Sequence, residues 1–496
     1  MEISLILLLS VAVYPMGALA GTLMPSLLGA LGRRMREEED PREAAAWMTM
    51  AISAVALALS ASVLPRIGDS DIVQVAVGDW GILVDRTGAL GLVLVSMLGV
   101  LAGAVMLPQL SGESPPQARV LLACGFAALG FMARDARQAV LCIAAMLACL
   151  AVALGRGADR AESRRAAWRF VVACLPGVVL LGWAVLSSAS RAGLTDMSLI
   201  KQVIAGESEA NIGALRALTV GAGLLLSLPL LPWFSPDLLS RRPMGATVAA
   251  YGIGAVAVGW AFTRCAYGLF PWAEGWELAR RGWMIPALAL PSAGFMVAAC
   301  LARSPSAMVS WALAAQGLWI PLAFATGGRA QAGFGVGVAL SIAVPLARVA
   351  ILAVTSAGRE AMSGEHEGAS RVHRMAAWGA AVVLGAGALW LPWRFMGWWR
   401  LLALLLLAAP SACLCVRVGR FAVAERMRRG PLYATIGAIA AAVAAIAVIP
   451  SPVPRALAGA VESDLGLHER FMVGPDGAPP PVNAPGAAEP QPIESP

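Results

Sequence analysis

The stretch LSLPLLPWFSPDL, residues 226–238, closes a long apolar run with Pro229, Pro232 and Pro236, followed directly by Asp237. Proline has no main-chain N–H to donate and its ring crowds the preceding turn, so each proline favours the end or the interruption of a helix. Two interpretations follow. The prolines can terminate the helix before the next loop, or they can break it inside the membrane, where irregular backbone is tolerated beside a water-lined cavity.

The composition of the 496-residue chain is that of a membrane protein. Its residues are 59% hydrophobic and only 14% charged, whereas a soluble domain is about 25% charged. Apolar runs of about 20 residues recur along the chain, and a run of that length crosses a bilayer as a helix. The sequence therefore predicts an all-α polytopic membrane protein.

Fourteen apolar runs are long enough to be counted as transmembrane helices. The first lacks a basic start and is too long for a signal-peptide core, so we expect it to be retained. Arginines gather in the odd-numbered loops, which the positive-inside rule places in the cytoplasm. We therefore expect the chain to lie in a bacterial inner membrane, with both termini on the side away from the cytoplasm. The predicted spans are residues 3–31, 44–64, 87–109, 117–134, 136–155, 167–188, 213–233, 244–265, 283–302, 306–326, 332–356, 375–392, 396–416 and 431–450.

Two segments outside these spans have patterns of their own. Between the second and third spans, Val73, Val75 and Val77 alternate on one face, and Gly-Asp-Trp-Gly follows as a turn. This pattern predicts a short extracytoplasmic β-hairpin near residues 72–85. The tail, residues 451–496, is rich in proline and alanine and cannot bury enough apolar surface to fold alone, so it is predicted to be disordered.

The sequence contains no motif for catalysis, metal binding or nucleotide binding. The eight cysteines are scattered through apolar runs without a CxxC pair, which is typical of small packing residues rather than of zinc or iron–sulfur ligands. There is no Walker A sequence and no GxGxxG motif after a strand. We therefore predict no catalytic residue, no metal, no cofactor and no nucleic-acid partner.

Four motifs occur along the chain in the order found in one known family. They are GDWGILVDRTGAL at residues 78–90, LPLLPWFSPDL at 228–238, SPSAMVSWALAAQG at 304–317 and LPWRFMGWWRLL at 391–402. They resemble the start of the third helix, the broken seventh helix, the start of the tenth helix and the broken twelfth helix of antiporter-like, proton-conducting membrane subunits. That family includes subunits of respiratory complex I, of membrane-bound hydrogenases and of multisubunit sodium/proton antiporters.

The resemblance implies an architecture for most of the chain. Asp85 takes the place of the aspartate in the third-helix motif, and Gln316 and Gly317 close the tenth-helix motif. The broken-helix residues would be Pro229, Pro232, Trp233, Pro236, Asp237 and Pro392. Two inverted five-helix repeats would follow three N-terminal helices and precede a last helix, with boundaries at residues 1–110, 111–265, 266–416 and 417–450.

The resemblance also implies a line of ionisable side chains at mid-membrane, and most of that line is missing here. In the family, a glutamate on the fifth helix pairs with a lysine on the seventh, and a histidine lies on the eleventh. The corresponding positions in this chain are Ala145, Leu224 and Val344. Ionisable groups inside a membrane are costly and are normally kept for function. Their loss implies a divergent family member with a degenerate or inactive proton channel.

Three arginines are the remaining candidates for a channel or coupling role. Arg400 takes the position of the family's key lysine on the twelfth helix, Arg348 aligns with a family lysine, and Arg264 ends the eighth span. Arginine stays charged and cannot release a proton as lysine can. Each of the three could instead orient water, bind an anionic group or extend to the membrane interface.

The predicted function is that of a membrane-arm subunit in a complex I-like or hydrogenase-like assembly that translocates protons or other cations. Its partners would be the other membrane subunits and lipids, and its role would be scaffolding and coupling. Two alternatives stay open: a fully competent translocator of the same family with its charged groups elsewhere, and a secondary transporter of small molecules with broken helices near mid-membrane. For a polytopic enzyme acting on lipid or sugar phosphates, the sequence offers no catalytic constellation.

Overall fold

The computed structural model describes mainly the part of the chain before residue 327. The predictions for the last four spans, for the tail, and for Asp85, Pro236, Asp237, Val344, Arg348, Pro392 and Arg400 lie outside the described residues. The described residues are 3–31, 41–63, 66–67, 73–77, 80–84, 86–106, 117–155, 160–203, 208–235, 246–247, 249–270 and 283–326.

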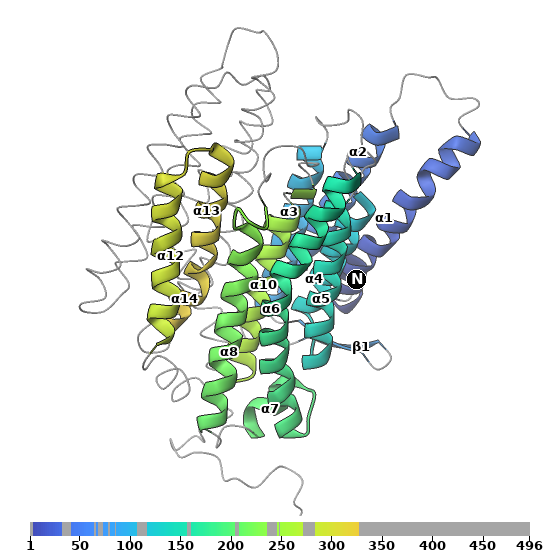
Figure 1. Ribbon diagram of the computed structural model, residues 1–496. Helices are drawn as coiled ribbons and strands as arrows, with labels where there is room; N and C mark the ends of the chain where they lie inside the picture. Colours follow the sequence, from blue (N-terminus) through green and yellow to red (C-terminus); the bar gives the residue numbers. More distant parts are fainter. Residues whose placement is uncertain are drawn as a thin grey trace, which may run out of the picture.

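Three N-terminal helices pack in series (Figure 1). They are α1 (Ile3–Leu31), α2 (Pro41–Val63) and α3 (Arg86–Met106), with α1 on α2 and α2 on α3. The buried hydroxyl groups of Tyr14 on α1 and Ser96 on α3 are hydrogen-bonded at 2.8 Å. This pair satisfies two buried polar groups between α1 and α3.

Four helices form the centre of the described bundle. These are α4 (Gln117–Phe131), α5 (Ala136–Leu154), α6 (Arg160–Ala192) and α8 (Ser208–Ser227), with the short α7 (Met197–Val203) at one end of the bundle (Figure 1). α4 packs on α5, α5 on α6 and α6 on α8. At the α6–α8 crossing, Gly177 and Gly221 face each other, so the two main chains approach without intervening side chains.

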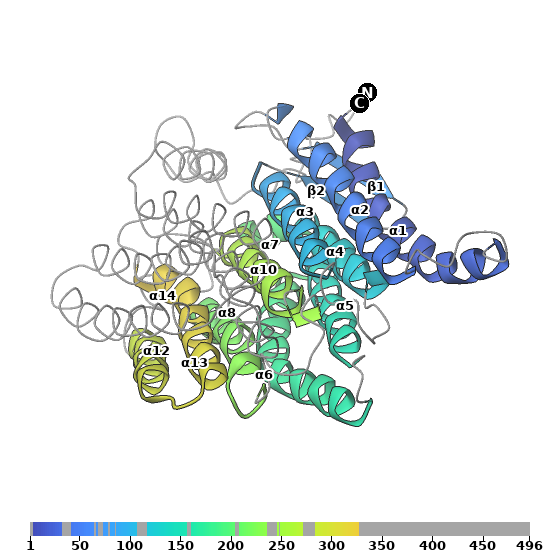
Figure 2. The same ribbon diagram turned by 90° about the horizontal axis from the view of Figure 1, so that it is seen from above.

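The remaining helices follow α8 in the sequence, and α10 packs among α3, α4, α5 and α8. A π-helical turn, η5 (Ala249–Ile253), leads into α10 (Gly254–Gly268), and α12 (Met284–Leu301) is followed by α13 (Pro305–Gly317) and α14 (Trp319–Thr326). Seen from above, α12 and α13 lie at the opposite edge of the described bundle from α1 and α2 (Figure 2).

The predicted tenth span, residues 306–326, is two helices in the structure. α13 ends at Gly317 and α14 begins at Trp319. Pro321 explains the division, because it has no N–H to donate to the carbonyl of Gly317 one turn earlier. The apolar run alone predicted one continuous helix, since both helices are apolar and the interruption is a single residue, Leu318.

The strands β1 (Val73–Val77) and β2 (Trp80–Val84) form a two-stranded antiparallel sheet within the segment where the sequence predicts a hairpin. Valine and isoleucine alternate along both strands, a pattern that suits a pleated surface with one face packed. The segment that follows α4 pairs with β2, because the N–H of Leu83 donates to the carbonyl of Met132 at 2.8 Å. The side of the membrane on which this layer lies stays a prediction.

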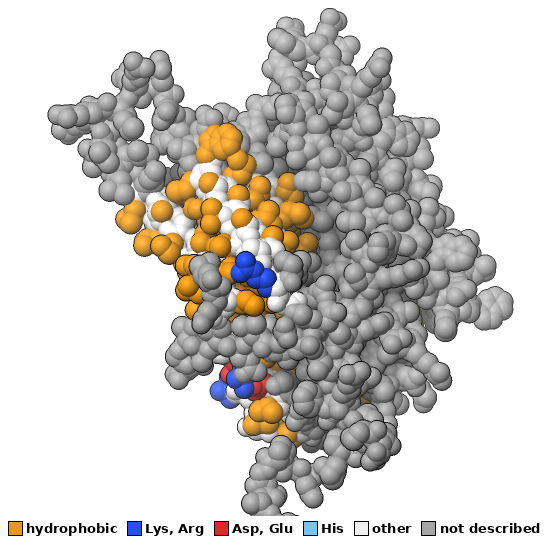
Figure 3. All heavy atoms as spheres, turned by 180° about the vertical axis from the view of Figure 1, so that it is seen from behind, with side chains coloured by type: hydrophobic (Ala, Val, Ile, Leu, Met, Phe, Trp, Pro, Cys, Tyr) orange, Lys and Arg blue, Asp and Glu red, His pale blue; other side chains and the backbone are white. Residues whose placement is uncertain are grey.

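Apolar helices of membrane-spanning length make this a multi-pass membrane protein. On the face seen in Figure 3, the described side chains are mostly apolar, with only a few charged groups. The fourteen-span count and the two inverted repeats stay predictions. Within the described residues, five helices are long and apolar enough to cross a membrane, by length and composition: Ile3–Leu23, Ala136–Leu154, Ala161–Ala192, Asn211–Leu230 and Met284–Leu301.

Candidate functional site at the break in helix α8

Helix α8 loses its regular geometry where the sequence places its prolines. The α-helix ends at Ser227, Leu228–Leu230 form a single 3-10 turn (η4), and Leu231 is extended, with φ −60° and ψ 142°. Pro229 lacks the N–H that would continue the helical hydrogen bonds. The two interpretations of the prolines, termination and interruption, differ only after Ser235, beyond the described part of this segment.

Side-chain hydroxyl groups satisfy carbonyls at the break. Ser235 Oγ donates to the carbonyl of Leu230 at 3.0 Å, and the hydroxyl of Tyr251 donates to the carbonyl of Pro229 at 3.4 Å. An unpaired buried carbonyl costs about 1–3 kcal/mol, and the hydrocarbon of a bilayer offers no water as a substitute partner. These two hydroxyl groups therefore allow an irregular backbone segment to be buried.

Tyr251 comes from the next element of the chain, the π-helical turn η5 that begins α10. Such turns are rare and are often found at functional sites. The side chain is 3% exposed, and its ring packs edge-to-face on that of Phe170 in α6, with 6.1 Å between the ring centroids. One residue of the α10 region therefore covers the break in α8 and fixes it against α6.

A small cavity adjoins the break, between α5, α6, α8 and α10. Its free space is about 20 Å³, which is room for one water molecule. The side chains around it are apolar apart from Tyr251 and Cys174, and they include Leu147, Leu225 and Pro229. Among the described residues that line this cavity there is no lysine, histidine or carboxylate.

Two of the predicted charge positions, Ala145 on α5 and Leu224 on α8, are half-buried and do not line this cavity. The lining residues on the same helices are Leu147, Leu225 and Leu226. Successive residues of a helix point about 100° apart, so residues one or two positions after Leu224 and Ala145 face the cavity in their place. All five side chains are uncharged, and the break has no titratable pair at any of these positions.

The other broken-helix residues of the described range lie on the outer side of the break. Pro232 is half-buried and Trp233 is exposed. The ring of Trp233 packs edge-to-face on that of Trp311 in α13, 5.5 Å between centroids, and Trp311 lies 5.4 Å from the ring of Phe295 in α12. This aromatic group connects the end of α8 to the α12–α13 pair.

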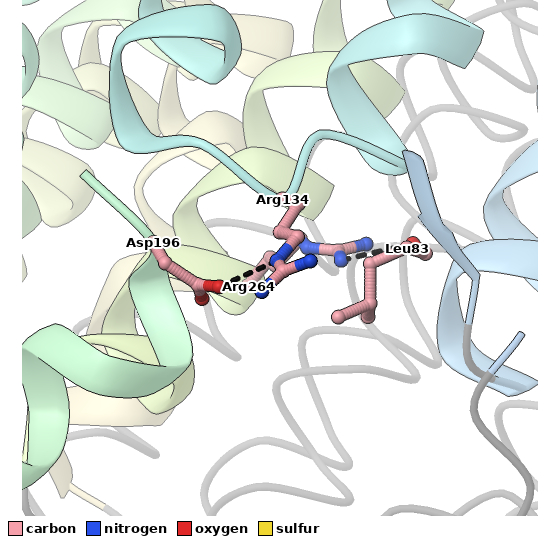
Figure 4. Close-up of polar contacts among 4 residues, drawn as sticks. All are labelled: Leu83, Arg134, Asp196 and Arg264. Carbon is pink, nitrogen blue, oxygen red and sulfur yellow. Dashed lines mark hydrogen bonds and ion pairs between the residues drawn. The ribbon is translucent and has the colours of Figure 1, made fainter. Parts of the chain in front are cut away.

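Arg264 lies thirteen residues after Tyr251, about 20 Å further along α10, in the layer formed by β2 and the end of α4 (Figure 4). Its guanidinium group donates to the carbonyl of Phe131 and, at 3.1 Å, to that of Leu83. Charge-assisted hydrogen bonds of this kind are stronger than neutral ones. In the structure Arg264 therefore connects α10, α4 and β2.

A second arginine of the same layer was not singled out by the sequence. Arg134 Nε donates to Asp196 Oδ2 at 2.5 Å (Figure 4). The two residues are 62 positions apart, and each follows an apolar run as an ordinary loop residue would. Only the fold brings them together, so no local pattern could have identified the pair. Tyr251 was missed for the same reason, although a hydroxyl within the apolar run ATVAAYGIGAVAVGW is a visible signal.

Comparisons with known proteins show which fold this is. A chain of respiratory complex I from Thermus thermophilus matches with a TM-score of 0.69 and 17% identity, over 92% of this chain and 99% of that one. A chain of the membrane-bound sulfane sulfur reductase, an archaeal respiratory membrane complex, matches with a TM-score of 0.76 and 14% identity, over 94% and 98%. A chain of the Mrp complex from Dietzia sp. matches with a TM-score of 0.68 and 14% identity, over 92% and 97%.

The chain has the fold of the antiporter-like membrane subunits. The resemblance predicted from the four motifs is confirmed at the level of the fold. No model of a known sequence family matches the chain, and no curated protein matches it. In this antiporter-like fold the break in α8 is surrounded by apolar side chains, and the hydroxyl groups of Ser235 and Tyr251 satisfy carbonyls there.

Replacing Tyr251 with phenylalanine is expected to loosen the break while leaving the fold intact. The ring would still pack on Phe170, but the Pro229 carbonyl would lose its partner, at a cost of about 1 kcal/mol because the bond is long. We expect faster amide hydrogen exchange in residues 228–235 and a lower unfolding temperature. Tyr14→Phe is the control, because it removes a buried hydroxyl–hydroxyl bond far from the break. Equal exchange of residues 228–235 in Tyr251→Phe and the native chain would refute this role of Tyr251.

Proposed function

We propose that this chain is a membrane subunit of a multisubunit, ion-translocating membrane assembly, in which it builds and couples the membrane arm without a complete proton line of its own. The observation that carries the proposal is the apolar break in α8. It has the irregular backbone that an ion path uses, but its cavity is lined without any ammonium, imidazole or carboxylate group among the described residues. The chains with similar folds belong to complexes, which supports the subunit role.

The physical basis is the cost and use of charge inside a membrane. A lysine can be deprotonated when it is desolvated and reprotonated when a carboxylate approaches, and that exchange moves a proton. Ala145 and Leu224 cannot take part in such an exchange, and neither can the lining residues Leu147 and Leu225. Arg348 and Arg400 remain our candidates for coupling to neighbouring subunits, as fixed charges rather than proton carriers.

The proposal includes an arrangement in the membrane. Residues 111–265 and 266–416 would form two inverted repeats, and the arginine-rich loops would face the cytoplasm of a bacterial cell, with both termini on the other side. The partners would be the other membrane subunits of the assembly and the surrounding lipids. The sequence motifs at residues 228–238 and 391–402 support the two broken helices of this arrangement.

The purified chain, reconstituted alone into liposomes, is expected to pass protons no faster than empty liposomes. The measurement is the decay of an imposed pH gradient, followed with a trapped pH-sensitive dye. Adding a channel-forming ionophore to the same vesicles is the control that shows they are sealed. Fast sodium/proton exchange by the isolated chain would overturn the proposal and favour a competent translocator with its charges at other positions.

The size of the cavity at the break is evidence against the alternative that the chain is a small-molecule transporter with its binding site there. Pockets for small molecules usually enclose about 300–1,000 Å³, whereas the cavity at the break has about 20 Å³ of free space. The break of α8 therefore does not favour binding of a metabolite at this point. Co-purification gives a second test, because a membrane-arm subunit should be isolated from native membranes together with other membrane subunits.

A further inference from the structure

Helix α6 is longer than the membrane is thick. It has 33 residues, a length of about 50 Å, whereas the hydrocarbon core of a bilayer measures about 30 Å. Its apolar part, residues 170–189, matches that thickness and is bounded by Arg169 and Arg191. The first turns of α6, residues 160–169, therefore extend into the region of the lipid headgroups.

One face of α6 is exposed along most of its length. Arg165, Trp168, Arg169, Val172, Leu175 and Val179 follow one another at intervals of one, three or four residues, so they share that face. Trp168 is 67% exposed, Leu175 57% and Val179 58%, and both arginines are exposed. Phe170, Cys174 and Leu181 are buried. The exposed stripe therefore faces away from the bundle.

The stripe changes in chemistry along its length. Arg165 and Arg169 lie one turn apart at the headgroup end, with Arg164 beside them and Glu162 as an opposing charge. Trp168 lies between the two arginines, at the level where tryptophan is enriched in membrane proteins. From Val172 to Val179, further along the helix, this face carries aliphatic side chains only, and the next aromatic ring on it is that of Trp183. The two arginines and Trp168 therefore share the headgroup end of the stripe and the aliphatic side chains follow, as the phosphate and glycerol region of a phospholipid are followed by its acyl chains.

We propose that this stripe binds an anionic phospholipid. Its phosphate would lie between the guanidinium groups of Arg165 and Arg169, whose donors match phosphate geometry, and one acyl chain would follow Val172, Leu175 and Val179. The apolar part alone would contact any lipid. The two arginines add selectivity for a negatively charged headgroup. This site is independent of proton movement, so it does not depend on the function proposed above.

The test uses the full chain in nanodiscs of phosphatidylcholine, with and without phosphatidylglycerol. Anionic lipid is expected to raise the unfolding temperature of the native chain by several degrees, since a ligand that binds only the folded state stabilises it. The double variant Arg165→Gln, Arg169→Gln is expected to lose most of that shift. The variant Arg137→Gln should keep the full shift in unfolding temperature. Arg137 is an exposed arginine at the start of α5, whereas the headgroup end of α6 follows the end of α5, so Arg137 lies away from the stripe.

Two further measurements make the site falsifiable. Native mass spectrometry should show phosphatidylglycerol retained by the native chain and by Arg137→Gln but not by the double variant. A photoreactive benzoylphenylalanine in place of Leu175 should form lipid adducts in native membranes. Equal stabilisation of all three proteins by phosphatidylglycerol, an equal shift from inorganic phosphate, or adducts to a neighbouring subunit would each overturn the proposal.

Discussion

Replacing Gly221 with valine is expected to prevent α6 and α8 from packing and to leave little folded protein. A Cβ atom added to Gly221 would lie 2.8 Å from the main-chain nitrogen of Leu181 and 3.0 Å from the carbonyl oxygen of Gly177. Main-chain atoms cannot rotate away as a side chain can. The two helices would have to separate, which costs more than the 1–3 kcal/mol typical of overpacking with side chains, and it would also open the cavity beside Leu225.

The matched control for this experiment is Gly213→Ala in the same helix. A Cβ atom at Gly213 would have nothing within 4 Å, and alanine is a better helix former than glycine by about 1 kcal/mol. We expect this variant to fold as well as the native chain or slightly better. Size-exclusion profiles in detergent and thermal unfolding measure both outcomes. A Gly221→Val protein that elutes and unfolds like the native chain would show that the described helix crossing is wrong.

Replacing Arg264 with methionine is expected to lower the stability of the chain by about 3 kcal/mol. The change removes the charge-assisted hydrogen bonds to the carbonyls of Phe131 and Leu83, and bonds of this kind contribute about 1.5–3 kcal/mol each. Methionine keeps most of the apolar stem, so the loss comes from the guanidinium group. Arg264→Lys should give an intermediate result, because one ammonium group cannot reach both carbonyls with the geometry of the planar fork.

Arg191→Met is the control for Arg264. Two hydrogen bonds of Arg191 are long, at 3.4 Å to the carbonyl of Ser187 and to the hydroxyl of Ser188 in its own helix, so a smaller effect than that of Arg264→Met is expected. Thermal unfolding in detergent compares the variants. The Arg264→Met variant could instead unfold at the native temperature and change the rate of ion movement in the assembled complex. Arg264 would then act in coupling to ion movement and would not be needed to hold α10, α4 and β2 together.

Local sequence patterns identified those features of the fold that depend on neighbouring residues. The apolar runs predicted helices, the alternating valines from Val73 to Val77 predicted the strand there, and the prolines from Pro229 on predicted an end or an interruption of the helix. The seventh span was drawn to residue 233, whereas the regular helix ends at Ser227. Each of these effects acts within one or two turns of the chain, so it is visible in a short window of sequence. The division of the tenth span at Leu318 was missed although Pro321 was visible, because the apolar run continues across it.

The polar contacts of the candidate site could not be predicted in this way. Tyr251 bonds to a residue 22 positions earlier, and Arg264 bonds to residues 133 and 181 positions earlier. Such pairs depend on how whole helices are placed. The resemblance predicted the region of the break, but the position of each channel residue within a helix turn was not determined, as the difference between Leu224 and Leu225 shows.

The layer around β2 has a mechanical consequence. The N–H of Leu83 donates to Met132, that of Ala136 donates to Thr195, and that of Met197 donates to Arg134. These bonds join three segments that are distant in sequence: β2, the link between α4 and α5, and the link between α6 and α7. The segments form one hydrogen-bonded layer at the same end of α4, α5 and α6. A sideways force applied to one of these helices at that end would be shared by all three. When these helices tilt, their opposite ends would therefore move most, and the layer around β2 would stay fixed as the point about which they turn together.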